Sequence, residues 1–583
     1  MATVHVFVGQ CGNQVGTDFL DSLASEAEAS VDEGYQMRVS ATHFRPALRK
    51  QPLRRRQQEQ PALGGAVRAP SGESSEATRR SGPQPYYSLS RYAEETALAR
   101  SDASLPQPRC VLVDMEPKVI DVTVQRANGL QTSPPPTAAN NEVSLSSVSP
   151  VPAPHHSLLP PPRRFYTLAP QQCVTRGEGS GNNWAFGYHQ QGQSRRGAIA
   201  DCLRRESEQQ GTVVSTFHVL HSVAGGTGSG VGCLVAEEIK AMFPRSTLLH
   251  SVVWPFRCGE VVTQWYNVLM AVSTLRDLAD GVCITYNDTV AEELKDVLAN
   301  RGMKGAGEVS FPLMNRRISE SLAPLHLPQL LYAVPSPEKD TSKNRIHGSG
   351  VARGILAGGG DGGATTAAFS VDTGTAPRRY ARASDVIEAL TLDPAMKFFT
   401  SVRAPQTVTG STTWTAVLGE AARSAQHCFT SSSALAPDMS PPRRRSVPAA
   451  PASTFVPDAA AFYMQQRCCL WALRGAAAHT SGIRELRHLM SCSGEAPFPM
   501  TSLFVAPVET WRAAPSDTRP DHSVTLYGPT PAVGASLADA ASRAEELLRV
   551  GAFVHHFERY GVSKAELHDA AAVLYDTAAA YSV

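Results

Sequence analysis

The chain has 583 residues, of which 42% are hydrophobic and 18% are charged, and its formal net charge at pH 7 is +1. The length suggests more than one domain, and a charge this close to zero gives no indication of a nucleic-acid partner. The longest apolar runs are far shorter than about 18 residues, and the start "MATVHVFVGQCGNQ" lacks a basic n-region, so we expect neither a transmembrane helix nor a signal peptide.

Strand signals in the first half alternate with helix signals. Short apolar runs predict strands at 4–8, 110–115, 212–224, 247–256 and 280–287. Apolar residues at helical spacing follow the first and the third of these runs. This alternation favours an α/β fold with a mostly parallel, doubly wound sheet.

The later part of the chain has a different pattern. "RCCLWAL" and "TSLFVAPVET" (467–473 and 501–510) resemble strands of an α+β region, and the chain from about 536 is Ala-rich and helical. We therefore divide the chain into a nucleotide-binding domain, a core helix with an intermediate domain, and a C-terminal helical region, at 1–288, 289–535 and 536–583.

Four segments have the composition of disordered insertions. They are rich in Arg, Gln, Pro, Ser, Gly or Ala and carry too little apolar surface to offset chain entropy; they span about 45–109, 130–164, 336–383 and 436–453. The run "GGGDGG" in the third has no strong strand before it or helix after it, so we interpret it as a flexible linker.

The eleven cysteines include no Cys-x-x-Cys pair. This spacing predicts neither a zinc site nor a disulfide framework built on cysteine. We expect buried free thiols in a reducing compartment.

The stretch "AGGTGSGVG" (224–232) lies between a predicted strand and a predicted helix. Glycines let the backbone bring N–H groups close to phosphate oxygens, and the helix N-terminus adds partial positive charge. The stretch has no P-loop lysine and no Rossmann spacing with an acidic residue about 20 positions later. It therefore predicts a third kind of phosphate loop.

Three other polar turns accompany this loop. They are "VGQCGNQVG" (8–16), "VLVDMEPKVI" (111–120) and "GEGSGNNWAFGY" (177–188). Ligands of open α/β sheets bind at the carboxyl ends of the strands, where such turns collect. Together and in this order, these stretches resemble the tubulin superfamily. "AGGTGSG" of this chain is similar to the signature loop of that family, with Ala224 in place of the usual first glycine.

The resemblance covers nearly all of the chain outside the four insertions, and it implies a site for GTP or GDP with Mg²⁺. The residues that match the family's nucleotide contacts are Gln10, Cys11, Glu116, Asn182, Ser222, Gly226, Thr227, Gly228, Gln264, Asn287, Phe311 and Asn315. Glu116 matches the acid near the magnesium ion, and Asn287 and Asn315 match asparagines that read the guanine. For Phe311, which matches the base-stacking aromatic, a plain core aromatic is the alternative.

Two of these matches are imperfect. Gln264 stands where α- and β-tubulins carry a ribose-contacting glutamate, although a glutamine carbonyl can still accept a ribose hydroxyl. Pro312, Pro324 and Pro328 interrupt the expected central helix.

Hydrolysis would be completed in trans. "ASDVIEALTLDPAMKF" (383–398) resembles the acidic loop that one tubulin subunit offers to the nucleotide of the next. Asp385 and Glu388 are three residues apart and share one face of a helix. Glu388 would orient a water for attack on the γ-phosphate, and the alternative is a helix-capping or solvated acid pair.

Within the superfamily, "VLVDMEPKVI", "GSGNNWAFGY", the loop with Gln264 and "SDVIEALTLDP" are most similar to δ-tubulins. This resemblance implies a cytoplasmic, cytoskeletal protein of centrioles or basal bodies that supports triplet microtubules and cilium or flagellum assembly. Its partners would be α/β-tubulin, other minor tubulins and centriole proteins, with neither nucleic acid nor membrane. The alternative is a GTP-binding scaffold at microtubule ends that neither polymerises nor hydrolyses GTP; a dinucleotide enzyme is disfavoured because the chain lacks the Rossmann acid.

Overall fold

The computed structural model describes residues 1–30, 32–45, 105–128, 165–208, 213–259, 261–300, 309–332, 380–391, 393–405, 413–430, 469–492, 503–505 and 522–581. Of the four segments expected to be insertions, 130–164 and 436–453 lie wholly outside these residues. The other two are described only at their edges, where short strands form: β2 (Phe44–Arg45) pairs with β3 (Gln107–Pro108), and β10 (Tyr380–Ala381) pairs with β9 (Gln329–Tyr332).

The core of the structure is one sheet with the strand order β10-β9-β13-β12-β14-β11-β8-β7-β6-β1-β4-β5. The remaining strands of this sheet span Ala2–Val8 (β1), Cys110–Val113 (β4), Cys173–Val174 (β5), Val214–Ser222 (β6), Thr247–Trp254 (β7), Gly281–Tyr286 (β8), Phe398–Ala404 (β11), Leu470–Gly475 (β12), Leu503–Val505 (β13) and His522–Gly528 (β14). Neighbours from β11 to β5 are parallel, which confirms the expected α/β fold.

The first two of the three expected domains both contribute strands to this sheet. β11 belongs to the later part of the chain, yet it pairs in parallel with β8 of the first part, with Phe398 opposite Val282. On its other side, β11 pairs antiparallel with β14. The hydrogen-bonded ladder thus continues from one part into the other.

Alternating apolar residues explain why both faces of the sheet are covered. Val4, Val6 and Val8 of β1 pack into one core cluster, whereas Phe7 packs into the cluster on the opposite face. Successive side chains of a strand point to opposite faces, so a strand that is apolar throughout needs a layer of helices on each side.

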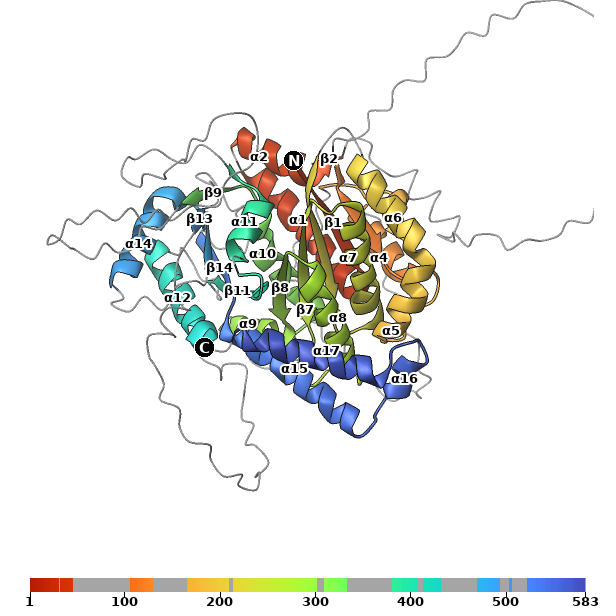
Figure 1. Ribbon diagram of the computed structural model, residues 1–583. Coiled ribbons are helices and arrows are strands. Elements are labelled where there is room, and N and C mark those ends of the chain that lie inside the picture. The colour runs from red at the N-terminus through yellow and green to blue at the C-terminus, as the bar shows by residue number, and fades with distance from the viewer. Residues whose placement is uncertain are drawn as a thin grey trace, which may run out of the picture.

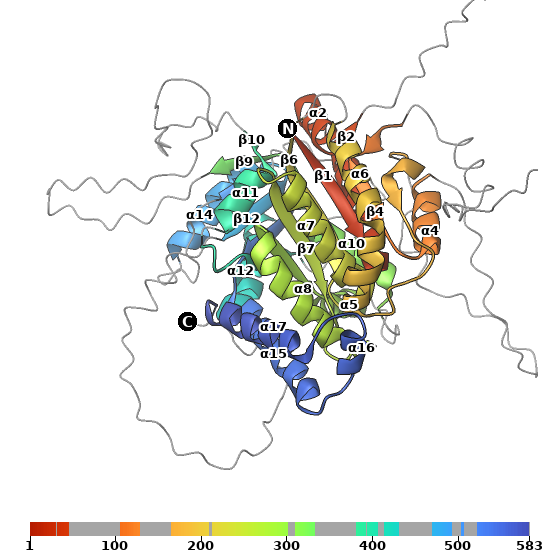
Figure 2. The same cartoon turned by 45° about the vertical axis from the view of Figure 1, so that its right-hand side comes forward.

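Helices α6, α7 and α8 cover the first face (Figure 2), and α1, α4 and α10 pack on the opposite face. Their bounds are Gly9–Ala29 (α1), Pro117–Ala127 (α4), Gln193–Glu208 (α6), Gly232–Met242 (α7), Gln264–Leu278 (α8) and Phe311–Leu322 (α10). The second face also carries α2 (Glu33–His43), α9 (Asn287–Asn300) and α11 (Ala383–Leu390). A third cluster packs α12 (Trp414–Thr430) and α14 (Ile483–Cys492) on β12 and β14.

The C-terminal helices α15 (Pro531–Arg549) and α17 (Lys564–Ala579) run side by side and pack on α8, with the short α16 (Val554–Glu558) between them in sequence (Figure 1). The Ala-rich sequence permits this close packing, because small side chains let helix backbones approach each other. None of the helices in the described ranges is long and apolar enough to cross a membrane.

The prolines divide the expected central helix. Pro312 occupies the first turn of α10, where the missing N–H has no intrahelical partner to lose. The α-helix ends at Leu322, and Pro324 lies in a following 3₁₀ turn, Ala323–Leu325. The helix is therefore short.

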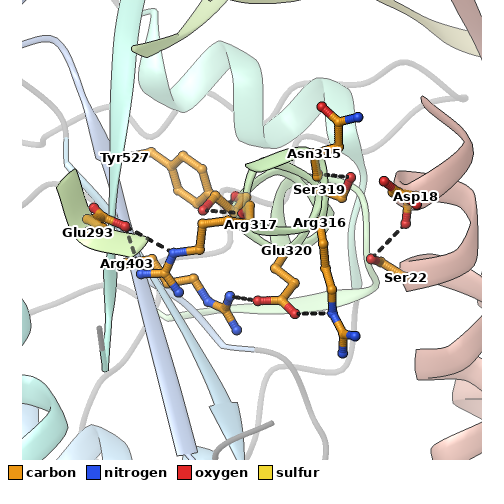
Figure 3. Close-up of polar contacts among 11 residues, drawn as sticks. Asp18, Ser22, Glu293, Asn315, Arg316, Arg317, Ser319, Glu320, Arg403 and Tyr527 are labelled. Atoms are coloured by element: carbon orange, nitrogen blue, oxygen red, sulfur yellow. Dashed lines mark hydrogen bonds and ion pairs between the residues drawn. The ribbon is translucent and has the colours of Figure 1, made fainter. Parts of the chain in front are cut away.

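Ion pairs fasten α10 to its neighbours (Figure 3). Glu320 contacts Arg403 of β11 and Arg316 one turn away, the latter with a separation of 3.2 Å between Nε and Oε1. Arg317 pairs with Glu293 of α9 at 2.9 Å, and the Tyr527 hydroxyl of β14 donates to the Ser321 carbonyl. Burial alone would raise the pKa of Glu320, but the surrounding guanidiniums outweigh it and lower the pKa to about 2.

Glu320→Gln should reduce the free energy of unfolding at pH 7 by about 3 kcal/mol, because it leaves Arg403 and Arg316 without their carboxylate. The folded pKa lies below the ordinary value, so the contribution is complete above about pH 4.5 and is lost as the pH falls towards 2. Urea unfolding of both proteins should therefore give a difference at about pH 3 that is less than half of the difference at pH 7. Glu208→Gln, which removes an exposed i,i+4 partner of Arg204, is the control and should change nothing measurable; an equal effect of both variants would contradict the role of Glu320.

Candidate functional site

The polar turns predicted from the sequence meet at one edge of the sheet. Parallel strands β1, β4, β6, β7 and β8 end at Val8, Val113, Ser222, Trp254 and Tyr286. Because the strands are parallel and adjacent, the segments that follow them emerge at the same edge. This edge collects a glycine turn, two carboxylates, the signature loop and an asparagine.

Two of the glycine-rich turns interlock through their backbones. A Cβ atom on Gly226 would lie 2.6 Å from both the carbonyl oxygen of Ser180 and the amide nitrogen of Asn183. Gly9 has a φ of +76°, and a Cβ atom there would lie 3.0 Å from the amide nitrogen of Gly228. Only glycine fits at these positions, and the result is that three separate turns present their backbones within one small volume.

Hydroxyl groups of the same turns also meet. The side-chain oxygens of Ser180 and Thr227 are 2.8 Å apart, and the Ser222 hydroxyl accepts from the Ala224 amide at 3.2 Å. Asn182 adopts a left-handed conformation with a φ of 52°, which asparagine tolerates better than most residues. Its side-chain oxygen faces Gly225.

The Asn267 side chain of α8 holds these turns together through hydrogen bonds to their backbone, and no sequence motif predicted it. Its side-chain nitrogen donates to the carbonyls of Asn182 and Ala224, at 2.9 and 2.6 Å, and its side-chain oxygen accepts from the Trp184 amide at 2.8 Å. Asn267 is fully buried. A polar residue inside "QWYNVLMAV" on an otherwise apolar helix is the signal that could have identified it.

The first turn of α1 supplies free backbone donors. The helix begins at Gly9, and its N-cap residue Val8 makes no side-chain cap. The first N–H groups of a helix lack intrahelical partners and carry partial positive charge, so this turn is suited to an anion. Gln10 is exposed there, whereas burial raises the pKa of the Cys11 thiol to about 12, which keeps it protonated.

Two carboxylates follow β4. Asp114 is buried, and burial raises its pKa to about 7 despite a hydrogen bond from the Glu116 amide to its Oδ1. Its other oxygen, Oδ2, has no hydrogen-bond partner among the described residues. Glu116 is exposed and lies against Gly179. An unpaired buried oxygen beside an exposed carboxylate fits a divalent cation or its water shell.

The residues that match base contacts come from α9 and α10. Asn287 is the first residue of α9, directly after β8. Phe311 begins α10 and is 64% exposed, so the alternative interpretation as a core aromatic is wrong. Asn315, one turn later, is largely buried, and α10 is held against α1 by a hydrogen bond from Ser319 to the Val15 carbonyl.

The Gln264 side chain is engaged by the neighbouring turn and is not available at this edge of the sheet. It is buried, and its Nε2 donates to the Phe256 carbonyl at 3.0 Å. Its carbonyl oxygen lies against Gly259. The side chain thus fixes the turn 256–259, and a ribose contact stays a prediction.

Asp385 and Glu388 lie at the opposite end of the sheet. They belong to α11, which borders a pocket of about 380 Å³ together with Thr247 and Lys397, which lie at the starts of β7 and β11. Figure 1 shows α11 near the end of the sheet where the chain begins, away from α5 (Trp184–Phe186) in the third glycine turn. Asp385 accepts a hydrogen bond from the Arg382 amide at 2.9 Å and so caps its own helix, whereas Glu388 is exposed.

Comparisons with protein families and with curated proteins agree with each other. Residues 2–295 match the family "Tubulin/FtsZ family, GTPase domain". Tubulin delta chains of Macaca fascicularis and Homo sapiens are 25% and 24% identical over 328 residues, which cover 56% of this chain and 53% of each relative. A tubulin gamma chain of Candida albicans is 27% identical over 307 residues, covering 51% of this chain and 48% of that relative. The chain thus aligns with about half the length of these curated relatives.

Gly226→Ala should destabilise the protein by about 1–3 kcal/mol, because the added methyl group collides with the backbone of the neighbouring turn. Gly197→Ala is the matched control: it lies on α6 with open space around its Cβ position, and it should stabilise the helix by about 0.5–1 kcal/mol. Denaturant unfolding measures both. If Gly226→Ala were as stable as Gly197→Ala, the turns would not be interlocked as described.

Proposed function

The chain belongs to the Tubulin/FtsZ family, and on that premise we propose that it is a GTP-binding tubulin of the δ type. The observation that supports this proposal most directly is the interlocked backbone of three glycine turns around Gly226 at the carboxyl edge of the sheet. The δ assignment rests on the sequence matches and on the resemblance to tubulin delta chains.

In this proposal, the phosphates are held by backbone N–H groups and short hydroxyl side chains. The uncapped start of α1 brings Gln10 and Cys11, and the signature loop brings Gly226, Thr227 and Gly228, with Ser222 just upstream. Asn182 would face the terminal phosphate. Neutral donors arranged in this way replace the lysine of a P-loop.

A magnesium ion fits beside these residues, because Asp114 Oδ2 is an unpaired buried oxygen and the Glu116 carboxylate is exposed next to it. The ion would neutralise phosphate charge. Glu116 and Asp114 would hold its water shell, and the raised pKa of Asp114 would fall when a cation is present.

The guanine would be read by Asn287 and Asn315 and would stack on Phe311. In the free protein the exposed Phe311 ring leaves apolar surface in contact with water, which is unfavourable. Stacking on a base would bury that surface. The Arg317–Glu293 pair between α10 and α9 fixes the two helices that carry these side chains.

GTP hydrolysis, if the protein performs it, would be completed at a contact between subunits. Glu388 lies at the end of the sheet opposite the glycine turns, so it cannot reach the nucleotide of its own chain. In a head-to-tail contact it would face the nucleotide of the neighbour, where an exposed carboxylate can orient a water. Asp385 has a capping role instead, and we assign the catalytic role to Glu388 alone.

For its cellular role, we propose a cytoplasmic, cytoskeletal protein of basal bodies or centrioles that supports triplet microtubules at the base of cilia or flagella. The resemblance to tubulin delta, gamma and beta chains supports other tubulins as its partners. A non-hydrolysing GTP-binding scaffold at microtubule ends is the second candidate, and the use of Asp385 as a helix cap favours it, since only one acid of the pair is available.

The full-length protein should bind GTP in the presence of Mg²⁺ and should prefer it to ATP, which equilibrium dialysis with radiolabelled nucleotides measures. Asn287→Ala should weaken GTP binding about 10-fold, because it removes hydrogen bonds to the guanine edge, and should leave weak ATP binding unchanged. Glu292→Ala, an exposed substitution on the same helix, is the control. Equal affinities for GTP and ATP in the unmodified protein would contradict the proposed base site.

Glu388→Ala should leave GTP binding by the isolated protein unchanged and should abolish any GTP turnover stimulated by added αβ-tubulin. Asp576→Ala, an exposed acid on α17, controls for surface charge. Phosphate release with and without αβ-tubulin is the measurement. Loss of GTP binding in isolated Glu388→Ala would rule out the role in trans, and a lack of stimulation in the unmodified protein would favour the scaffold.

A further inference from the structure

A cluster of four buried histidines lies inside the fold, away from the nucleotide edge. His5 of β1 and His218 of β6 are directly opposite each other in the parallel ladder. His43 ends α2, and His326 follows the 3₁₀ turn after α10. All four are at most 4% exposed, and nothing in the proposed function uses them.

Hydrogen bonds define the tautomers of three of these rings. His43 Nε2 lies 2.9 Å from the His326 carbonyl and must donate to it, so His43 Nδ1 accepts from His5 Nε2 at 3.0 Å. His5 Nδ1 is therefore left with a lone pair. It faces His218 Nδ1 at 3.0 Å, and His218 Nε2 lies 2.9 Å from the Ser251 hydroxyl.

His326 has no such arrangement. Both of its ring nitrogens are buried, and neither has a hydrogen-bond partner among the described residues. Its ring lies 4.2 Å from that of His218 and 5.4 Å from that of His5, measured between centroids. A buried imidazole without hydrogen-bond partners is costly, and a ligand for its nitrogen would offset that cost.

One nitrogen from each of His5, His218 and His326 lies within 4.8 Å of the other two. We propose that these three histidines bind a transition-metal ion, Zn²⁺, as a structural site in the core. Three neutral imidazoles suit zinc, copper or nickel and not magnesium or calcium, which prefer oxygen ligands. Zinc–nitrogen bonds of about 2.0–2.1 Å in tetrahedral geometry place ligand nitrogens about 3.3 Å apart, so His326 has to move inward by at most about 1.5 Å.

The second shell fits this site. Binding requires lone pairs on His5 Nδ1 and His218 Nδ1; the first is already present, and the second needs only the other neutral tautomer. His218 Nε2–H would then donate to the Ser251 hydroxyl, and His5 Nε2–H would keep its bond to His43. Outer partners of this kind orient metal-bound histidines.

The charge state of the rings is also suitable. Burial is the main cause that lowers the pKa of His218 to about 3 and the pKa of His5 and His326 well below the usual range. The rings are therefore neutral at physiological pH, as metal ligands must be. The group contains no carboxylate or thiolate among the described residues, so a water or small anion would complete the coordination.

Such an ion would join three parts of the fold. His5 and His218 lie four residues before Gly9 and Ser222, where the strands leave for the glycine turns, and His326 lies just beyond α10. The ion would thus fasten the 3₁₀ turn after α10 to the two central strands. Its effect is on stability, and it does not depend on nucleotide binding.

The test uses the full-length chain purified without a histidine tag. After removal of metal, Zn²⁺ is added and the protein is dialysed against a weak chelator, because a chain with 17 histidines also binds zinc weakly at its surface. Elemental analysis should find about one zinc per chain, and Co²⁺ substituted for zinc should give the strong visible absorption of a four-coordinate site. Zinc should raise the thermal midpoint.

His326→Leu should lose the bound zinc and the Co²⁺ spectrum, and its thermal midpoint should no longer respond to zinc. His250→Asn is the matched control, because His250 forms a similar buried pair with His221 at 2.9 Å but belongs to no group of three possible metal ligands among the described residues; it should keep about one zinc. If His326→Leu fails to fold, His326→Asn replaces it, and the Co²⁺ spectrum of the unmodified protein decides independently of any variant. Absence of that spectrum would overturn the proposal, and so would equal zinc retention by a folded His326 variant. The proposal is also wrong if, with zinc present, His326→Leu is at least as stable as the unmodified protein.

Discussion

The close contact between glycine turns at the carboxyl edge of the sheet is the constraint on which the rest of the structure depends. A Cβ atom on Gly226 would collide with the backbone of Ser180 and Asn183, and one on Gly9 would lie in tight contact with the backbone of Gly228. Asn267 then fastens two of the turns from within α8. Because the turns touch through main-chain atoms, their N–H groups are held in place before any ligand arrives, which lowers the ordering cost of binding.

In our proposal, the two ends of the sheet carry different functions. The turns that hold phosphate in our proposal follow the carboxyl ends of the strands, whereas α11 with Glu388 lies beside the amino ends of β7 and β11. In our proposal, a molecule built this way completes its site with a neighbour stacked in the same direction. The continuous ladder from β8 to β11 gives both ends one rigid frame, and the Glu320–Arg403 pair fastens α10 to that frame.

Local patterns predicted the parallel strands, the glycine turns and the C-terminal helices, because apolar runs and glycine spacing are properties of short segments. Contacts between distant segments were not predictable in this way. Side-chain orientations were not predictable either. Gln264 turns towards the carbonyl of Phe256 and Phe311 is exposed at a helix start, although composition indicates neither. The four histidines of the cluster lie at positions 5, 43, 218 and 326, and they meet through the pairing of β1 with β6, the end of α2 and the return of the chain after α10.

The most direct test of the central claim is amide hydrogen exchange of the full-length protein with and without GTP and Mg²⁺. GTP should slow exchange in the three glycine turns, at 9–12, 177–188 and 224–230, while exchange in α11 at the other end of the sheet stays unchanged. Slower exchange at α11 without any change in the glycine turns would contradict the account, since it would place the nucleotide at the wrong end of the sheet.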